Sequence, residues 1–465
     1  MLFNSLHYIF FLPAVVILYY LLANRFRWIL LFLASCFFYM VFKPEYILIL
    51  SAIILIDYFS GIYIEQAEGR KRKTLLIVSI LSNVSLLAFF KYYNFANTLF
   101  GTLMWKLGSA TPFPFMEIIL PIGLSFHTFQ SMSYTIEVYR GNQKAERHLG
   151  YFSVYVLFFP QMVAGPIERF ASLGRQLKED HRLTYENIVN GLRLILYGFF
   201  VKMVIADNLA PIVNEVYANV GMLNSKHILT GIFFFSLQIY ADFYGYSLIA
   251  VGSARMLGIQ LMDNFKTPYL AKNIHEFWQR WHISLSTWFR DYLYIPLGGS
   301  KVKVSRWMFN ILVVFTVSGL WHGANKTFII WGFLHGALYL IEHFTSRFIK
   351  LPSSKLMNVF LVLKNFVLVS FIWVFFRSEN LTKAKQIFNS LFHNTSVADN
   401  FVVDVRIWIL LLLFIISDFL LFNNRADVYM SKLKTPIRWV AYALLLFCIL
   451  ALAGVEKQAF IYFQF

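Results

Sequence analysis

Apolar residues occur along this chain in long runs separated by short polar segments. About a dozen such runs can be marked, and most lack the polar face that a helix at the surface of a soluble protein carries. The pattern predicts apolar helices near residues 8–23, 28–42, 46–63, 75–90, 118–132, 188–205, 228–251, 309–320, 328–341, 359–376, 407–422 and 440–454.

Several of these runs are shorter than the roughly 20 residues that a full membrane span needs. We expect some of them to be re-entrant or half-buried helices, which are tolerated where protein rather than lipid surrounds them. The run near 8–23 is not preceded by a basic region or followed by a signal-peptide cleavage site, so we expect it to be retained as the first span. No repeat or Pro/Gly/Ser linker divides the chain, which predicts a single integral-membrane domain over residues 1–465.

Residues 275–299 differ from the apolar runs, because bulky apolar and polar side chains alternate there at helical spacing. The two faces are Trp278, Trp281, Leu285 and Trp288 on one side, and Arg280, Ser284, Thr287 and Asp291 on the other. Such a helix is too charged to cross a membrane. We therefore expect one amphipathic helix at the membrane interface, where Trp is favoured.

Composition supports a membrane protein, since 58% of the residues are hydrophobic and only 14% are charged. Soluble domains average roughly 25% charged residues. The chain has only two cysteines, Cys36 and Cys448, both in apolar runs, and this count excludes a disulfide-rich scaffold or a cysteine-rich zinc site. The fold class predicted is an all-α polytopic membrane protein.

The formal net charge of +17 is carried by basic residues in short loops, so it does not indicate a nucleic-acid partner. Lys and Arg are enriched in cytoplasmic loops, where they meet anionic lipid head groups. Arg25 and Arg27 lie after the first predicted span, and residues 70–73 (RKRK) lie after the third. Two spans separate the basic loops, so both are predicted to be cytoplasmic and the N-terminus to be outside.

His322 follows an apolar run that ends at residue 320. An ionisable side chain at such a depth is costly and is usually functional. The alternative is a neutral histidine that forms a hydrogen bond across helices, and the sequence leaves both open. Gly323 and Ala324 leave space beside the ring, and Asn325 is placed to orient or polarise a group.

His335 follows 13 residues after His322. On one helix this spacing gives a rotation of roughly 220°, so the two rings do not share a face. A zinc pair on a helix needs a spacing of i and i+4, so we predict no metal site. Both histidines can serve one reaction only if the helix breaks between them, and Gly323 and Asn325 permit that break.

Three further residues have simpler interpretations. His127 lies in a segment of mixed polarity, and His282 is interpreted as an interfacial residue of the amphipathic helix. Asp242 lies in an aromatic membrane segment, where it is predicted to pair with a basic residue such as Arg255 or to line a pathway. The chain has no P-loop and no GxSxG string, so it lacks the usual devices of nucleotide and serine hydrolases.

Several unusual strings resemble the bacterial branch of the membrane-bound O-acyltransferases, and most closely the alginate and polysaccharide O-acetyltransferases. They are residues 120–141 (LPIGLSFHTFQSMSYTIEVYRG), 158–169 (FFPQMVAGPIER), 238–258 (QIYADFYGYSLIAVGSARMLG), 277–299 (FWQRWHISLSTWFRDYLYIPLGG) and 319–336 (GLWHGANKTFIIWGFLHG). The resemblance implies a ring of transmembrane and re-entrant helices around a central funnel that holds a catalytic histidine.

In that family the histidine of the WHG string is catalytic, which assigns the role to His322. A second membrane histidine is often associated with the site, and His335 matches it. The other residues of the matching strings that we expect to contact substrate are Trp321, Asn325, Asp242, Arg280 and Trp281.

Residues 460–465 (FIYFQF) resemble the FxYxxF hexapeptide that ends bacterial acyl-relay proteins, in which the tyrosine carries the acyl group. The resemblance assigns this carrier role to Tyr462. The alternative is an aromatic anchor at the membrane interface, where Tyr and Phe are enriched.

These assignments predict that an acetyl group passes from a cytoplasmic thioester, with acetyl-CoA the expected donor, to Tyr462. His322 is expected to act as the general base. A periplasmic or extracellular partner of the serine-esterase type would then pass the group to a polysaccharide. An alginate-like exopolysaccharide is the favoured acceptor, and peptidoglycan stays open. A multi-pass location in the inner membrane is expected, with no bound cofactor. A transporter or a docking scaffold without covalent chemistry is the alternative class.

Overall fold

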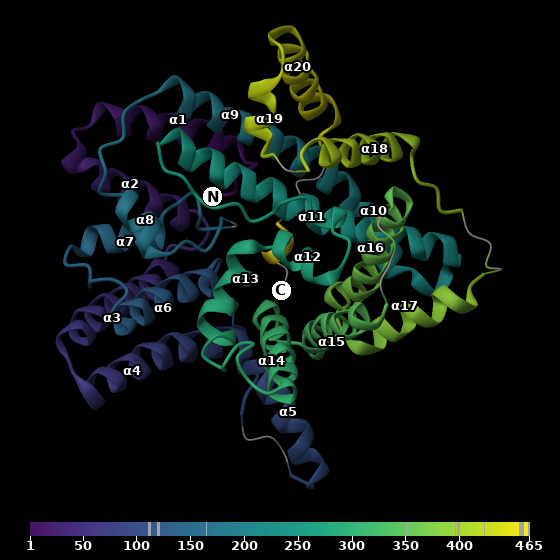
Figure 1. Ribbon diagram of the computed structural model, residues 1–465, viewed down its shortest axis with the longest axis horizontal. Coiled ribbons are helices and arrows are strands. Elements are labelled where there is room, and N and C mark those ends of the chain that lie inside the picture. Colours follow the sequence, from purple (N-terminus) through teal and green to yellow (C-terminus); the bar gives the residue numbers. More distant parts are fainter. Residues whose placement is uncertain are drawn as a thin grey trace. The chain divides into compact units, whose positions relative to one another are not determined.

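The computed structural model describes residues 1–109, 113–118, 121–163, 165–349, 352, 354–395, 397, 400–422, 424–454 and 460–463. Helices are the regular elements of this part of the chain, and no strand occurs in it, which confirms the all-helical prediction (Figure 1). Contacts divide the chain into two compact units. Unit 1 is Met1–Gly191 with Ala250–Met262, and unit 2 is Leu192–Ile249 with Asp263–Phe465. The prediction of one domain stays a prediction.

Unit 1 is a bundle in which α3, α4 and α6 pack against one another. Its core includes a buried carboxylate, Asp57, which accepts hydrogen bonds from Ser79 Oγ at 2.6 Å and from Asn83 Nδ2 at 2.8 Å. The helices are α1 (Leu6–Leu21), α2 (Asn24–Met40), α3 (Tyr46–Gln66), α4 (Gly69–Leu87), η1 (Ala88–Tyr92), α5 (Tyr93–Lys106), α6 (Leu124–Arg140), α7 (Leu149–Leu157), α8 (Phe170–Gln176) and the start of α9 (Tyr185–Phe199).

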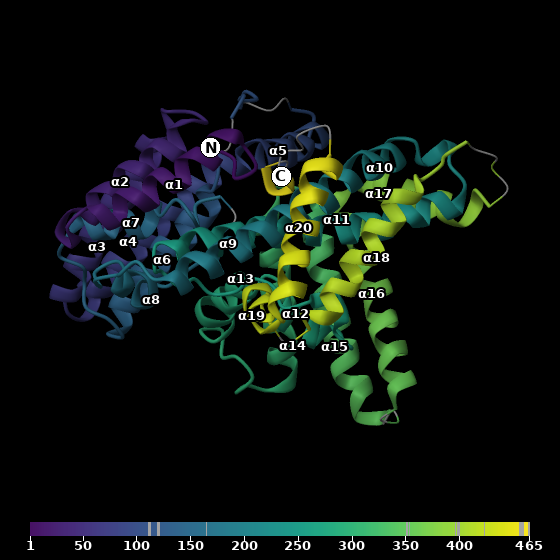
Figure 2. The same cartoon turned by 90° about the horizontal axis from the view of Figure 1, so that it is seen from above.

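Unit 2 contains the long helix α11 up to residue 249, together with a hairpin of α14 and α15. The two helices of the hairpin lie side by side in Figures 1 and 2. Its first elements are η2 (Phe200–Ala206), a π-helix, then α10 (Asp207–Ala218), η3 (Val220–Met222), α11 (Ser225–Met256), η4 (Pro268–Leu270), α12 (Ile274–Arg280), α13 (Ile283–Phe289) and η5 (Arg290–Tyr294). They are followed by α14 (Val304–His322), α15 (Lys326–Phe348), α16 (Lys355–Arg377), α17 (Leu381–His393), α18 (Val405–Leu420), α19 (Ala426–Lys432), α20 (Thr435–Leu452) and η6 (Ile461–Phe463).

Most predicted apolar runs coincide with helices, but the run near 118–132 does not. There α6 begins only at Leu124, after Gly123 with φ +75°. Pro121 cannot donate a main-chain hydrogen bond within a helix, and a left-handed residue ends regular helix geometry. Residues 119 and 120 lie outside the described residues.

The prediction of one amphipathic helix over residues 275–299 is wrong. The segment forms α12, α13 and η5, with His282 between the first two in a left-handed conformation at φ +43°. Main-chain groups at the break bond to another segment, because Lys266 N–H donates to the Arg280 carbonyl and Ile283 N–H donates to the Asn264 carbonyl, each at 3.0 Å. These bonds replace the main-chain hydrogen bonds that a continuous α-helix would form at that point.

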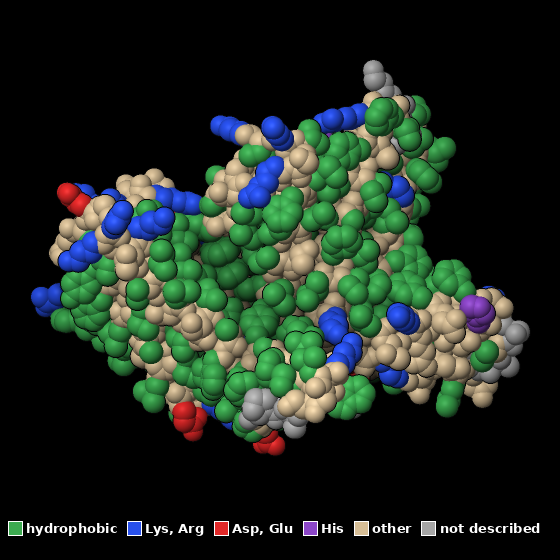
Figure 3. Space-filling model, turned by 90° about the horizontal axis from the view of Figure 1, so that it is seen from below, with side chains coloured by type: hydrophobic (Ala, Val, Ile, Leu, Met, Phe, Trp, Pro, Cys, Tyr) green, Lys and Arg blue, Asp and Glu red, His purple; other side chains and the backbone are tan. Residues whose placement is uncertain are grey.

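The prediction of a multi-pass membrane protein is supported by helix length and surface. Seven helical stretches of the described chain are long and apolar enough to span a bilayer: residues 46–66, 69–106, 185–218, 225–256, 304–322, 355–377 and 435–452. The last of these, α20, has no buried residue. Hydrophobic side chains also cover much of the face in Figure 3, with Lys and Arg in scattered groups. Such a surface suits lipid as solvent.

Candidate active site

The helix is broken between the two membrane histidines, which is the condition under which both can serve one reaction. Helix α14 ends at His322, and α15 begins at Lys326. Asn325 caps α15, because its Oδ1 accepts the Thr327 N–H at 3.1 Å. A capping amide satisfies one of the donors that a helix start leaves open. His322 therefore lies at a helix end with a turn beside it.

Glycines let α14 and α15 approach closely. A Cβ at Gly319 would lie 2.1 Å from the Phe328 carbonyl oxygen, and a Cβ at Gly332 would lie 2.2 Å from the Phe315 carbonyl oxygen. Small residues of this kind allow backbone contact between membrane helices. The hairpin thus fixes the end of α14, and with it the position of His322.

His322 is 6% exposed and is surrounded by aromatic rings. The distances from its ring centroid are 4.9 Å to Trp321, 5.2 Å to Trp331 and 5.3 Å to Phe376. The ring of Tyr462 lies at 5.5 Å. Residues 140 positions apart in the sequence therefore meet, and the C-terminal tyrosine is a direct neighbour of the histidine.

Tyr462 belongs to η6 and packs on Phe243 at 4.7 Å and on Phe460 at 5.4 Å between ring centroids. Its hydroxyl is buried and has no hydrogen-bond partner among the described residues. Burial, together with the charge of Asp242, raises the pKa of this phenol well above its ordinary value. The phenol is therefore neutral and needs a base before it can act as a nucleophile.

Asp242 holds the main chain beside this tyrosine. Its Oδ2 accepts the Ile461 N–H at 2.7 Å, and its Oδ1 lies 2.5 Å from Lys202 Nζ. The predicted pairing of Asp242 with a basic residue is confirmed, but that residue is Lys202 and not Arg255. Arg255 is 13 residues further along α11, about 20 Å along the helix axis at 1.5 Å per residue. It pairs instead with Glu186 at 3.2 Å.

His335 does not contact Tyr462 within the described chain. Its ring lies 5.0 Å from Trp278 and 4.9 Å from Trp331, and neither ring nitrogen has a hydrogen-bond partner among the described residues. Trp331 contacts both histidines edge to face. This arrangement connects His335 to the site through a tryptophan rather than through a reacting atom.

His282, which the sequence pattern indicated to be an interfacial residue, is instead a buried neighbour of the site. It is 1% exposed, and its ring centroid lies 4.7 Å from that of Phe243 and 6.4 Å from that of His322. Burial lowers the pKa of His282 to about 3, so its imidazole is neutral. The positive φ of this residue is uncommon outside glycine and is a feature of sites under constraint. The string Trp281–His282 inside a matching stretch was the available signal.

Comparison with known proteins supplies the family. The sequence profile of the MBOAT, membrane-bound O-acyltransferase family, matches residues 16–382. The chain belongs to the membrane-bound O-acyltransferase family. It is therefore an acyltransferase.

Individual relatives agree with this assignment. A probable alginate O-acetylase of Pseudomonas aeruginosa is 38% identical over 397 residues, which cover 84% of this chain and 75% of the relative. A peptidoglycan O-acetyltransferase of Helicobacter pylori is 33% identical over 520 residues, which cover 100% of this chain and 98% of the relative. A teichoic acid D-alanyltransferase of Bacillus subtilis is 30% identical over 275 residues, 55% of this chain and 68% of the relative.

The remaining predicted substrate contacts of the acyltransferase lie at different distances from His322. Trp321 is its direct neighbour. Trp281 is buried, and its ring centroid lies 5.0 Å from that of Trp373, which in turn stacks on Trp331. Asn325 has its amide engaged by the helix cap and by the Glu379 carbonyl.

Arg280 contacts Glu276, Lys266 and Phe422 of unit 2. It bonds to Glu276 at 3.0 Å and to the Lys266 carbonyl at 3.0 Å, and its guanidinium lies over the ring of Phe422. These contacts brace α12 at the segment that breaks the amphipathic pattern.

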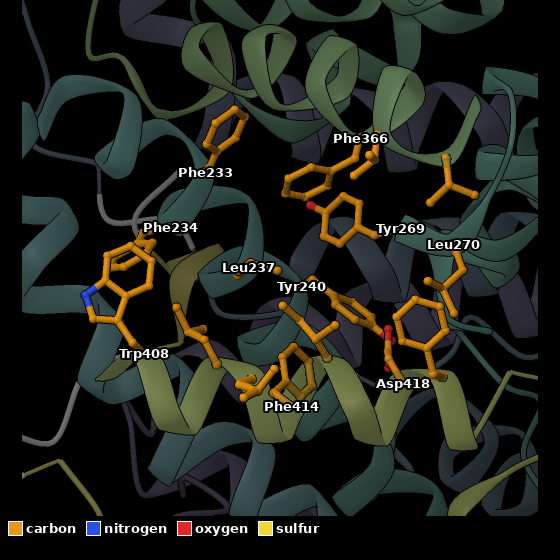
Figure 4. A pocket seen from close by; sticks show the side chains of 16 residues that line it. Phe233, Phe234, Leu237, Tyr240, Tyr269, Leu270, Phe366, Trp408, Phe414 and Asp418 are labelled. Atoms are coloured by element: carbon orange, nitrogen blue, oxygen red, sulfur yellow. The ribbon is translucent and has the colours of Figure 1, made fainter. Parts of the chain in front are cut away.

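The acyltransferase also contains an apolar cavity of about 530 Å³ in unit 2. Figure 4 shows that Tyr240 and Asp418 face each other at its wall, where the Tyr240 hydroxyl donates to Asp418 Oδ1 at 2.9 Å. Tyr240 also lies 6.1 Å from Trp281, ring to ring. None of the predicted site residues lines this cavity.

Proposed function

We propose that this acyltransferase moves an acetyl group from a cytoplasmic thioester, through Tyr462, to a hydroxyl of an extracytoplasmic polysaccharide. The observation that carries the proposal is the 5.5 Å between the ring centroids of His322 and Tyr462 inside a buried aromatic cluster. The names of the relatives, which acetylate alginate or peptidoglycan, support acetyl as the acyl group and a glycan as the acceptor.

In the first step His322 accepts the phenolic proton as the Tyr462 oxygen attacks the acetyl carbonyl. The new bond joins the phenolic oxygen to the acetyl carbon, and the bond that breaks joins that carbon to the thioester sulfur. The thiolate leaves and takes up the proton. A base is required because a phenol ordinarily has a pKa of about 10 and this one is buried.

In the second step an acceptor oxygen attacks the acetyl-tyrosine ester, and the phenol is regenerated. A covalent relay divides one transfer, whose donor and acceptor lie on opposite sides of a membrane, into two reachable steps. We propose that a partner of the serine-esterase type collects the acetyl group, that acetyl-CoA is the donor, and that the protein lies in the inner membrane.

The acceptor has two candidates, each favoured by a specific observation. The identity of 38% to alginate O-acetylases favours an alginate-like exopolysaccharide, which is the acceptor we propose. The end-to-end match with a peptidoglycan O-acetyltransferase favours peptidoglycan as the second candidate. The test measures the ester-linked acetate that mild base releases from each polymer, in cells with and without the gene. The polymer that loses its acetate when the gene is absent is the acceptor.

The test of the enzymatic proposal uses the purified protein in lipid vesicles with acetyl-CoA labelled in the acetyl group. The relay predicts label bound covalently to the peptide that contains Tyr462. A transporter predicts label inside the vesicle with none on the chain. A docking scaffold predicts neither, and either of these results would overturn the proposal.

A further inference from the structure

Three charged side chains, Lys202, Asp207 and Asp242, form a buried cluster. The cluster contacts residues 460–463, which are called the C-terminal segment below. Lys202 Nζ lies 2.7 Å from Asp207 Oδ1 and 2.5 Å from Asp242 Oδ1. The three side chains are between 1% and 5% exposed. A buried cluster of charges often stabilises a fold no more than hydrophobic side chains of similar volume would. Its presence here therefore suggests a role other than stability.

The cluster makes a directional contact with the C-terminal main chain. The second oxygen of Asp242 accepts the Ile461 N–H at 2.7 Å. A hydrogen bond to a charged acceptor is stronger and more specific than one between neutral groups. This bond anchors the main chain of the segment at residue 461, and the packing of the neighbouring side chains determines that it is this residue that lies opposite Asp242.

Neighbouring contacts fix the register of the segment. Phe460 is fully buried, and its ring lies 4.6 Å from that of Tyr246. Lys202 Nζ lies 5.4 Å from the centre of that same Tyr246 ring. The chain before the segment is also attached to η2, since Gly454 N–H donates to the Met203 carbonyl at 3.0 Å.

We propose that Asp242, held by Lys202, is a positioning residue that anchors the C-terminal segment in the register in which residue 462 faces His322. The proposal rests on the function proposed above, because it concerns where the acyl carrier is placed. In this proposal Asp242 contacts the main chain of the C-terminal segment, which carries Tyr462, rather than the substrate. A shift by one residue would bring an isoleucine or a phenylalanine, neither of which carries a nucleophile, to the histidine.

The test compares two insertions that lengthen the chain equally. One alanine is inserted between Ile461 and Tyr462, after the residue that Asp242 binds. The control alanine is inserted between Glu456 and Lys457, before that residue. Both proteins are given labelled acetyl-CoA in vesicles, and acetyl on the C-terminal peptide is measured by mass spectrometry. We expect the first insertion to abolish loading of Tyr462 and the control to preserve it.

A second pair tests the carboxylate itself. Asp242→Asn removes the charge that pairs with Lys202, and Asp418→Asn makes the same change at another buried carboxylate of unit 2, which binds Tyr240. We expect Asp242→Asn to slow loading of Tyr462 by roughly 10²-fold, the effect of a small misplacement of a reacting group. The concentration of acetyl-CoA needed for half-maximal loading should stay unchanged, and Asp418→Asn should load normally.

The outcomes separate this proposal from the relay. If the unaltered protein loads Tyr462 and both insertions behave alike, or if Asp242→Asn loads at the normal rate, the register proposal is overturned and the relay stands. If the unaltered protein carries no acetyl on Tyr462, the relay fails and this proposal fails with it. The insertion pair leaves the charged cluster intact, so it decides the question even if Asp242→Asn does not fold.

Discussion

At the scale of single residues, the proposed chemistry depends on a proton transfer between two buried rings. Burial and the charge of Asp242 raise the pKa of the Tyr462 phenol, which makes the phenol harder to ionise. The same carboxylate also holds the main chain beside the tyrosine, because it accepts the Ile461 N–H. His322, whose ring centroid lies 5.5 Å away, is the base that the geometry offers. His335 lies behind Trp331 and is assigned a supporting role.

Substitution His322→Ala should abolish acetyl transfer while leaving a folded protein in the membrane. Loss of a general base typically slows a reaction by about 10²–10⁴-fold. The rate of label transfer from acetyl-CoA in vesicles measures the effect, with the unfolding temperature as a check on folding. His335→Ala is the matched comparison and should cost less. Near-normal transfer by His322→Ala would make this histidine structural.

Individual residues differed in how far the sequence could predict them. His322 stood out because an ionisable group follows an apolar run, which costs free energy in any fold. His282 was interpreted as an interfacial residue, since the sequence pattern did not reveal the break in the helix that places it, with positive φ, in the buried cluster. The partner of Asp242 was also beyond reach, because Lys202 comes from a different helix and only the fold brings the two together.

At the scale of elements, the hairpin of α14 and α15 determines where His322 lies. Its helices touch through glycines, and the turn between them is closed by the cap at Asn325. The sequence permitted this break, because Gly323 and Asn325 come shortly after His322. It did not predict the division of residues 275–299, since the main-chain bonds that interrupt that helix come from residues 264–266.

The hairpin predicts different costs for one substitution at two glycines of the same helix. Gly332→Ala places a Cβ 2.2 Å from the Phe315 carbonyl oxygen, which forces the helices apart. Gly336→Ala, one turn later, meets its first neighbour, Phe315 Cβ, at 3.2 Å. We expect Gly332→Ala to lower both the unfolding temperature and acetyl transfer, and Gly336→Ala to change them much less. Equal effects would refute the close contact.

A buried carboxyl before α8 predicts how unit 1 responds to pH. Burial raises the pKa of Glu168 from 4.5 to about 7, although a hydrogen bond from the Met262 N–H at 2.6 Å opposes the shift. Between these values the unfolded chain ionises Glu168 while the folded chain keeps it protonated. The contribution of Glu168 to the free energy of unfolding is therefore fully present below pH 4.5, and it is lost as the pH rises through about 7.

The unfolding temperature of the detergent-solubilised protein should accordingly fall between about pH 5 and about pH 8. Glu168→Gln removes the titrating group, so the fall should be smaller in that variant. Circular dichroism at a series of pH values measures both proteins under the same conditions. The same slope in the two proteins would show that Glu168 does not titrate in this range.

At the scale of the whole molecule, hydropathy and charge predicted the membrane class and the first four helices closely. Helices α1 to α4 occupy the four apolar runs predicted near residues 8–23, 28–42, 46–63 and 75–90. Arg25 and Arg27 lie in the first turn of α2 and residues 70–73 at the start of α4, and the predicted orientation stays a prediction. The meeting of the C-terminal segment with His322 was implied only by family resemblance, because hydropathy carries no long-range pairing.

The orientation is tested by a single cysteine placed within residues 70–73, after Cys36 and Cys448 are replaced by serine. Positive residues are retained on the cytoplasmic side, so a membrane-impermeant maleimide should label this cysteine only in opened cells or inside-out vesicles. A cysteine between α2 and α3 is the control, and it should be labelled from outside. Labelling of residues 70–73 in intact cells would reverse the orientation.

The central claim is that Tyr462 carries the acetyl group, and its most direct test removes a single oxygen atom. Tyr462→Phe preserves the ring and its packing on Phe243 and Phe460, so an aromatic anchor would tolerate it. A covalent carrier would not, because the nucleophile is gone. The measurement is ester-linked acetate on the extracellular glycan in cells that produce either protein at equal levels. We predict its loss in Tyr462→Phe, whereas unchanged acetylation would contradict the carrier role.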